Sequence, residues 1–107
     1  MEKSVFVQFL GDAPLIRVID FLIENSIFDY TKTEIAENSR ISRASLYNIW
    51  STLERYELVT KTRKIGNTVL YKLNKENPVV QKLIELDLKI SKEYAELLDD
   101  AQAVIIP

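Results

Sequence analysis

The stretch from Thr31 to Leu73 decides the fold, and it reads TKTEIAENSRISRASLYNIWSTLERYELVTKTRKIGNTVLYKL. Thr31 is followed three residues later by Glu34, the spacing of a capping box at a helix start. Ser42 precedes a run of apolar residues with helical spacing, as an N-cap residue does. We therefore predict a short helix, a tight turn and a second helix over residues 43–56, which together form a helix-turn-helix.

A β-hairpin is predicted directly after the second helix. Leu58-Val59 begins its first strand, and Thr68 to Leu73 alternates polar and apolar residues as the second strand. Gly66-Asn67 lies between them and supplies the positive φ that a tight hairpin requires. A helix-turn-helix followed by a hairpin is a winged helix, so the expected fold class is α+β, mostly α.

The segments ISRASLY, LERYELV and TRKIGNTVLYKL resemble winged helix-turn-helix transcription regulators of the MarR/ArsR-like class. They are most similar to the small, archaeal-type, single-domain versions, and the resemblance covers roughly residues 12–77. Many such regulators have Gly where Tyr56 or Glu57 stands here, to end the recognition helix in a left-handed turn. The resemblance implies a sequence-specific regulator that binds double-stranded DNA.

The composition excludes several classes of function. The chain has 107 residues, of which 47% are hydrophobic, and this predicts one compact unit. It contains no Cys and no His, so thiolate metal sites and the usual general base are missing. We therefore predict no enzyme and no cofactor. No apolar run reaches the roughly 18 residues that span a bilayer, and no signal peptide is recognisable, so a cytoplasmic protein is expected.

Charge is distributed unevenly along the chain. The net charge is −2, yet residues 40–75 carry eight basic and two acidic side chains. Residues 1–39 and residues 76–107 each carry three basic and seven acidic side chains. A basic module between acidic flanks can bind phosphate locally while the whole protein stays acidic. The alternative is a chance cluster of charges on a solvated face.

The second helix of the motif carries the residues expected to read DNA bases. Its core-facing residues are Leu46, Ile49, Trp50 and Leu53. The residues predicted to contact DNA on the outer face are Ser42, Arg43, Ala44, Ser45, Tyr47, Asn48 and Ser51. Arg43 can pair with two atoms of guanine, and Asn48 can do the same with adenine. Tyr47 either bonds a phosphate through its hydroxyl or packs partly under the wing.

The hairpin is predicted to lie on the phosphates beside the occupied groove. The predicted wing and phosphate contacts are Arg40, Lys61, Arg63, Lys64, Asn67 and Thr68. Such contacts position a protein on DNA but carry little sequence information. If about six lysine and arginine side chains per subunit contact phosphate, the expected log–log salt slope is roughly −5 per half-site.

Two segments precede the motif. The apolar residues Val5 to Leu10 are short enough to be either a strand or a helical turn, packed within the subunit or against a partner. Asp12-Ala13-Pro14 predicts the start of a longer helix, with Asp12 as its cap and Pro14 in its first turn. Phe28 and Tyr30 are expected in a short extended piece that pairs with the hairpin.

A long helix is predicted from Pro78 to about residue 103, with Asn77 as its cap. Residues 1–77 would then form the DNA-binding part, and residues 78–107 a dimerisation helix of the same compact unit. The residues predicted to pair with a second copy are Val79, Leu83, Leu86, Ile90, Tyr94 and Leu97. Asp87 falls beside this seam, so the coiled-coil pattern is imperfect. The alternative is that the helix folds back onto its own first helix.

Three readings of function follow. The first is a homodimeric, sequence-specific transcription regulator, or its variant, an architectural or plasmid-maintenance DNA binder. The second is a winged-helix module that binds protein without binding DNA. The third, an enzyme, has no supporting motif, because His, Cys and ligand clusters are all missing. Neither an operator sequence nor an effector ligand can be inferred from these residues.

Overall fold

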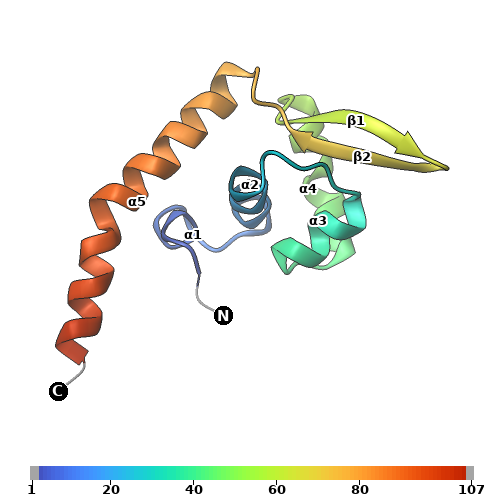
Figure 1. Ribbon diagram of the computed structural model, residues 1–107. Helices are drawn as coiled ribbons and strands as arrows, with labels where there is room; N and C mark the ends of the chain where they lie inside the picture. Colours follow the sequence, from blue (N-terminus) through green and yellow to red (C-terminus); the bar gives the residue numbers. More distant parts are fainter. Residues whose placement is uncertain (1–2, 106–107) are drawn as a thin grey trace.

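The computed structural model describes residues 3–105, without the side chains of residue 96 and residues 98–105. In Figure 1 the hairpin and the last helix lie at opposite ends of the molecule, with the first two helices between them. The elements are α1 (Val5–Leu10), α2 (Pro14–Glu24), α3 (Lys32–Ser39), α4 (Arg43–Arg55), β1 (Val59–Ile65), β2 (Thr68–Leu73) and α5 (Pro78–Ile105). This order confirms the α-rich winged-helix fold.

The apolar segment near the N-terminus is a helix, α1. The Ser4 side chain caps it by accepting a hydrogen bond from the Val7 N–H at 3.1 Å. Phe6 and Val7 are buried, so α1 packs within its own subunit. It also contacts α5, where the Phe9 and Tyr94 rings stack with their centroids 5.6 Å apart.

Three helix starts lie where the sequence predicts them. Thr31 Oγ1 accepts from the Glu34 N–H at 3.1 Å, and the Glu34 carboxylate accepts from the Thr31 N–H at 2.9 Å, which completes the capping box. Ser42 Oγ accepts from the Ser45 N–H at 3.0 Å. Asn77 Oδ1 accepts from the Val79 N–H at 2.9 Å and caps α5. These caps satisfy N–H groups that a helix start leaves unpaired.

The prediction that Asp12 caps α2 is wrong. The N-cap residue is Ala13, which has no capping side chain, and Pro14 opens the helix. The Asp12 carboxylate instead pairs with Lys3 and Arg17. A bidentate arginine contact and a second cation compete with the weaker bond to a backbone N–H. The pKa of Asp12 therefore lies far below its ordinary value, chiefly because of the hydrogen bond from Arg17.

Both helices of the helix-turn-helix end in a left-handed turn that uses a residue other than glycine. Arg40 follows α3 with φ 58°, and Glu57 follows the α4 cap with φ 53°. The Leu58 N–H donates to the Leu53 carbonyl at 2.9 Å across the second turn. The left-handed conformation strains a side chain with a Cβ by about 1 kcal/mol. The left-handed turn for which glycine was expected near Tyr56 and Glu57 is therefore present here at Glu57.

Replacing Glu57 with glycine is expected to raise the free energy of unfolding by about 0.5–1 kcal/mol, because glycine adopts this φ without strain. The measurement is urea denaturation followed by circular dichroism. The matched control is Glu54→Gly inside α4, which should lower stability by about 1 kcal/mol. A destabilised Glu57→Gly variant would contradict the prediction.

The wing is a two-stranded antiparallel sheet whose register runs from Val59 opposite Leu73 to Ile65 opposite Thr68. A bulge interrupts β1 between Lys61 and Arg63. Tyr30 forms an isolated bridge to Tyr71 in β2, with both backbone hydrogen bonds at 2.8 Å. The expected extended piece before α3 therefore pairs with the wing, through a single bridge rather than a strand.

One hydrophobic core joins α1, α2, α3, α4, the wing and the start of α5. The buried side chains at its centre are Phe6, Val18, Leu22, Ile35, Leu53 and Val80. Trp50 is also buried and meets Tyr71 edge-to-face, with ring centroids 4.7 Å apart. This core fixes α4 by one face and leaves its opposite face in solvent.

Candidate nucleic-acid interface

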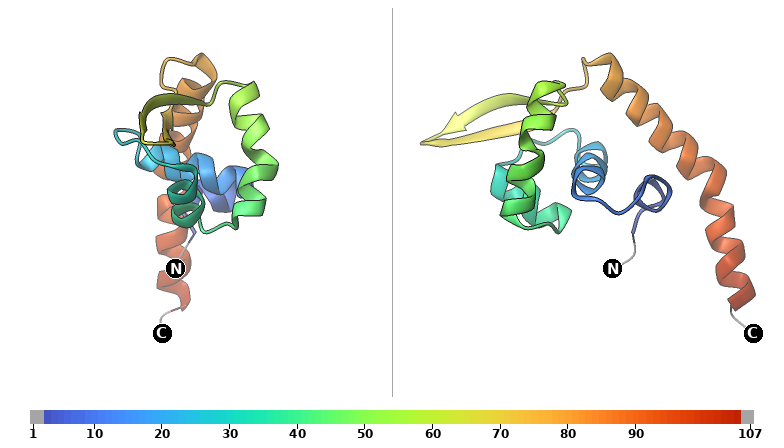
Figure 2. Two further views of the ribbon diagram at one scale, coloured as in Figure 1. Left: turned by 90° about the vertical axis from the view of Figure 1, so that its right-hand side faces the viewer. Right: turned by 180° about the vertical axis from the view of Figure 1, so that it is seen from behind.

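The outer face of α4 presents the predicted recognition residues. Arg43, Ala44, Asn48 and Ser51 are exposed, while Leu46, Trp50 and Leu53 on the opposite face are buried. Ser42 and Ser45 already form hydrogen bonds at the start of α4. The Ser42 hydroxyl caps the helix and also donates to Ser45 Oγ at 3.0 Å. Figure 2 shows α4 beside the wing at the end of the molecule away from α5.

Tyr47 is the largest apolar side chain on this face and is 66% exposed, so it is not packed under the wing. Its ring centroid lies 5.9 Å from Nζ of Lys32 at the start of α3. The same ammonium lies 4.6 Å from the Trp50 ring and 5.8 Å from the Tyr71 ring. Aromatic faces attract a cation at such distances. Lys32 is thereby held against the middle of α4.

Lys32 is a candidate phosphate contact that sequence reasoning missed. It lies outside the basic segment of residues 40–75, within the acidic segment of residues 1–39. Its position in the first turn of α3 was visible in the sequence, but its approach to Tyr47 and Trp50 depends on the packing of α3 against α4.

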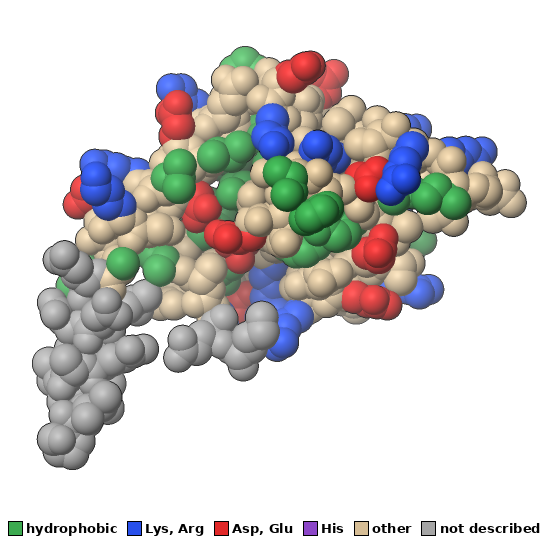
Figure 3. Space-filling view, in the orientation of Figure 1, with side chains coloured by type: hydrophobic (Ala, Val, Ile, Leu, Met, Phe, Trp, Pro, Cys, Tyr) green, Lys and Arg blue, Asp and Glu red, His purple; other side chains and the backbone are tan. Residues whose placement is uncertain are grey.

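The wing presents most of the predicted phosphate contacts in solvent. Lys61, Lys64, Asn67 and Thr68 are exposed, and Figure 3 shows lysine and arginine side chains along the wing. Arg63 is held differently. Its Nε and Nη2 atoms donate to the Asp29 carboxylate at 2.9 and 3.2 Å. Arg63 thus ties the wing to the segment before α3 in the free protein.

Asp29 accepts hydrogen bonds from two residues of the wing. Besides Arg63 it accepts a hydrogen bond from Thr62 Oγ1 at 2.6 Å, and Thr62 lies at the bulge in β1. Arg63, and next Thr62, hold the pKa of Asp29 below its ordinary value. A carboxyl whose pKa is lowered on folding contributes stability above its unfolded pKa and loses it as pH falls through the folded value. The wing contact therefore persists at neutral pH.

The Asp29 carboxyl is expected to titrate at a lower pH in the native protein than in the Arg63→Gln variant, because glutamine removes the positive charge. Carboxyl NMR signals followed from neutral to acid pH measure both midpoints. Lys64→Gln is the matched control and should leave the Asp29 midpoint unchanged. Equal midpoints in the native protein and Arg63→Gln would show that the Arg63–Asp29 pair does not persist in solution.

Arg40 lies in the turn between α3 and α4, and its side chain is exposed. Its carbonyl accepts a hydrogen bond from Arg17 Nη1 at 3.1 Å. Arg17 also binds Asp12, so it links the turn to the start of α2. The guanidinium of Arg40 therefore projects from a turn whose backbone is fixed.

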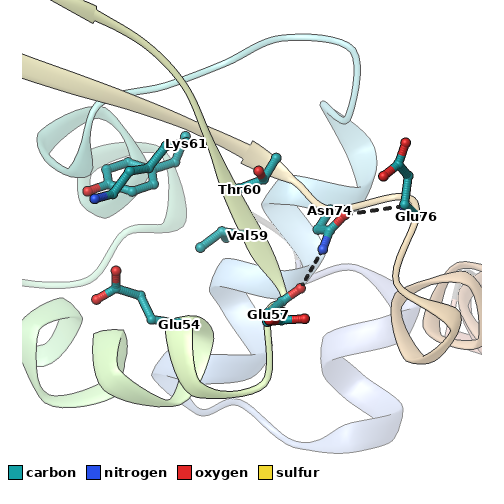
Figure 4. Close-up of a pocket in the computed structure, with 8 residues that line it drawn as sticks. Glu54, Glu57, Val59, Thr60, Lys61, Asn74 and Glu76 are labelled. Atoms are coloured by element: carbon teal, nitrogen blue, oxygen red, sulfur yellow. Dashed lines mark hydrogen bonds between the residues drawn. The ribbon is translucent and has the colours of Figure 1, made fainter.

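A hollow of about 500 Å³ lies between the C-terminal end of α4 and the base of the wing (Figure 4). Glu54, Glu57 and Glu76 line it, with Lys61 as its basic residue. Asn74 spans one wall by donating to the Glu57 carbonyl at 3.0 Å. Three carboxylates repel phosphate, so this end of α4 is a poor DNA contact. The electrostatics favour the N-terminal half of α4.

The predicted dimerisation residues divide into two groups. Ile90 is buried and Leu83 is packed against the core, so both stabilise their own subunit. Val79, Leu86 and Leu97 are exposed. They are separated by seven and eleven residues, which places them on one edge of a helix with 3.6 residues per turn. The remaining residue, Tyr94, is partly covered by Phe9 of the same chain.

No protein-family model and no curated protein sequence matches the chain. Solved structures of transcription regulators do match. The apo form of a mutant of Lactococcus lactis ZitR has a TM-score of 0.65 at 25% identity, covering 92% of this chain and 80% of ZitR. NadR in complex with 4-hydroxyphenylacetate has a TM-score of 0.61 at 22% identity, covering 95% of this chain and 73% of NadR.

MepR, a transcription regulator of the Staphylococcus aureus multidrug efflux pump MepA, has a TM-score of 0.64 at 20% identity. That match covers 89% of this chain and 68% of MepR. The neighbours also include a MarR family transcriptional regulator from Silicibacter pomeroyi. The chain has the fold of MarR-like winged-helix regulators. The expectation of a small archaeal type stays a prediction.

The neighbours whose role is stated, MepR and the Silicibacter pomeroyi protein, are transcription regulators. In the part of the chain that the structure describes, no helix combines the length and apolar character needed to cross a bilayer.

Proposed function

We propose that this protein is a homodimeric transcription regulator that binds double-stranded DNA in a sequence-specific manner. The N-terminal half of α4 enters the major groove, and the β1–β2 wing lies on the flanking phosphates. The observation that carries this proposal is a solvent-facing, polar α4 surface beside a basic wing, in a fold shared with transcription regulators.

Base reading is assigned to Arg43 and Asn48. Both are exposed near the start of α4, the part of a recognition helix that reaches base edges. Arg43 fits the O6 and N7 atoms of guanine, and Asn48 fits the N6 and N7 atoms of adenine. The small side chains of Ala44 and Ser51 allow the helix to seat deeply in a groove about 12 Å wide.

Phosphate binding is assigned chiefly to Lys32, Arg40, Lys61 and Lys64, with Asn67 and Thr68 at the wing tip. Arg63 is assigned to positioning the wing, because Asp29 already occupies its guanidinium. Four cationic contacts per subunit predict a log–log salt slope of about −3.6 per half-site, and Arg63 as a fifth contact would make it about −4.5. The slope therefore measures whether Arg63 leaves Asp29 on binding.

The proposal is tested by selecting bound fragments from genomic DNA and measuring duplex affinity by fluorescence anisotropy. The expected result is a two-fold symmetric site with half-sites about 34 Å apart and a strong salt dependence. Fragments without a common sequence would indicate the architectural variant. No duplex affinity in low salt would contradict DNA binding altogether.

Dimerisation is assigned to the exposed edge of α5 formed by Val79, Leu86 and Leu97. These apolar side chains lie in solvent in the single subunit along one edge of α5, and exposed apolar surface of this kind marks an interaction site. The exposed Phe9 and Leu10 of α1 extend the apolar surface near α5. We assign a second copy of the chain to this surface, because a symmetric DNA site needs two recognition helices.

Replacing Leu86 with glutamate is expected to convert the dimer to a monomer, because two buried carboxylates would face each other without partners. Sedimentation velocity measures the change. The matched control is Leu88→Glu, since Leu88 is exposed on the opposite side of α5 and should leave the dimer intact. Loss of the dimer in both variants, or in neither, would contradict the assignment of this edge.

One observation favours the alternative, a module that binds protein. Ile27 and Phe28 are exposed side by side in the loop between α2 and α3. Capture of a stoichiometric partner that Phe28→Ser abolishes, together with no duplex affinity in low salt, would replace the DNA-binding proposal with this one.

A further inference from the structure

Three carboxylates meet between α2 and α5. Asp20 and Glu24 are one helical turn apart on α2, and Asp87 approaches them from α5. One oxygen atom of each lies within 4.8 Å of the others. Figure 3 shows acidic side chains gathered where α5 meets the middle of the molecule. The cluster thus spans two elements far apart in the sequence.

Asp87 is only 7% exposed, an unusual position for a carboxylate. Among the described residues, no hydrogen bond or ion pair reaches its side chain. Burial, and then the negative charges of Glu24 and Asp20, raise its pKa. Oδ1 of Asp20 is also buried without a hydrogen-bond partner. Buried charges in proteins are normally paired or bound to a metal ion.

The basic side chains near the cluster are engaged elsewhere: on α5, Lys82 pairs with Glu85 and Lys89 pairs with Glu93. Lys3 and Arg17 both pair with Asp12. Glu24 is the last residue of α2, so the negative end of the helix dipole adds to the charge of the carboxylates. Among the described residues no basic side chain forms an ion pair with any of the three carboxylates, and a bound cation would neutralise their charge.

We propose that Asp20, Glu24 and Asp87 form a binding site for a divalent cation that prefers oxygen ligands, with Ca²⁺ as the best fit. All three oxygen atoms lie within 4.8 Å of one another, so small side-chain adjustments bring them onto one ion with bonds of about 2.3–2.6 Å. Ca²⁺ accepts irregular coordination by several carboxylates. Mg²⁺ demands near-ideal octahedral geometry and keeps most of its water ligands, so it fits less well.

Access from solvent is available. Asp20 and Glu24 line a hollow of about 290 Å³ together with Lys3, Arg17 and Arg40, and Glu24 itself is exposed. Water molecules that enter beside Glu24 would complete the coordination that three carboxylates begin. The occupied site would also join α2, which packs on the helix-turn-helix, to α5, and so fix the angle between them.

Calorimetric titration of the full chain with CaCl₂, without DNA, tests the site independently of the proposed function. The expected result is one Ca²⁺ per chain, with weaker binding of Mg²⁺. Glu24→Gln should weaken Ca²⁺ binding by more than about tenfold, and Glu24 is exposed, so this variant should fold. Glu37→Gln, an exposed carboxylate on α3, is the matched control and should bind like the native protein.

Thermal unfolding supplies the second measurement. Ca²⁺ should raise the Tm of the native protein and leave that of the isosteric Asp87→Asn variant unchanged. Absence of Ca²⁺ binding at millimolar concentration, or equal binding by Glu24→Gln, would overturn the proposal. A higher Tm in Asp87→Asn combined with no effect of Ca²⁺ on the native protein would also overturn it, and would indicate a proton shared within the cluster.

Discussion

Replacing Leu53 with alanine is expected to lower the free energy of unfolding by about 3–5 kcal/mol, the upper part of the range for buried leucines. Leu53 is 0% exposed and lies in the core that fixes α4. Its carbonyl also accepts the Leu58 N–H that closes the turn after α4. Loss of the side chain leaves a cavity beneath the recognition helix, which rigid neighbours fill only partly.

Urea denaturation measures this loss, with the variant and the native protein at the same concentration because a dimer adds its own stability. Ser51→Ala is the matched control, since Ser51 is exposed on the same helix and its replacement should change stability by less than about 0.5 kcal/mol. A loss below about 1 kcal/mol for Leu53→Ala would mean that α4 is not anchored by this core.

Replacing Arg43 with alanine is expected to weaken binding to the selected duplex by about 5- to 150-fold, the equivalent of the 1–3 kcal/mol of a bidentate base contact. The variant should also lose its preference for guanine at one position of each half-site. Lys64→Ala should differ, because a lost phosphate contact weakens binding to all sequences and makes the salt slope shallower by about 1.

Fluorescence anisotropy over a set of single-base substitutions separates these two effects. Lys92→Ala is the matched control, because Lys92 is exposed on α5 at the other end of the molecule from the wing. Unchanged specificity in Arg43→Ala would remove α4 from base reading, even if overall affinity fell.

Local signals in the sequence were sufficient to predict the helix-turn-helix and the wing. The caps at Thr31, Ser42 and Asn77 act within three residues of themselves, and Gly66-Asn67 sets the hairpin turn alone. Asp12 shows the limit of this reasoning. Aspartate is a common N-cap residue and Asp12 lies beside a helix start, but its carboxylate forms ion pairs with Lys3 and Arg17 instead.

Contacts between distant residues could not be predicted from local patterns. Arg63 binds Asp29 across 34 positions, and Lys32 reaches Trp50 only after α3 packs on α4. On α5 the near-heptad pattern did not reveal which residues face their own subunit, because that depends on where α1 lies. Asp87 interrupts the coiled-coil pattern of α5, and in the structure it lies beside Asp20 and Glu24 of α2.

The most direct test of the central claim is a map of the DNA-contacting surface by amide NMR, recorded on the full chain with and without the selected duplex. The predicted result is that the largest shift changes fall on the N-terminal half of α4, the turn at Arg40 and the wing around Lys61 and Lys64. Shift changes confined to α5 or to the loop at Ile27 and Phe28, with α4 unaffected, would contradict it.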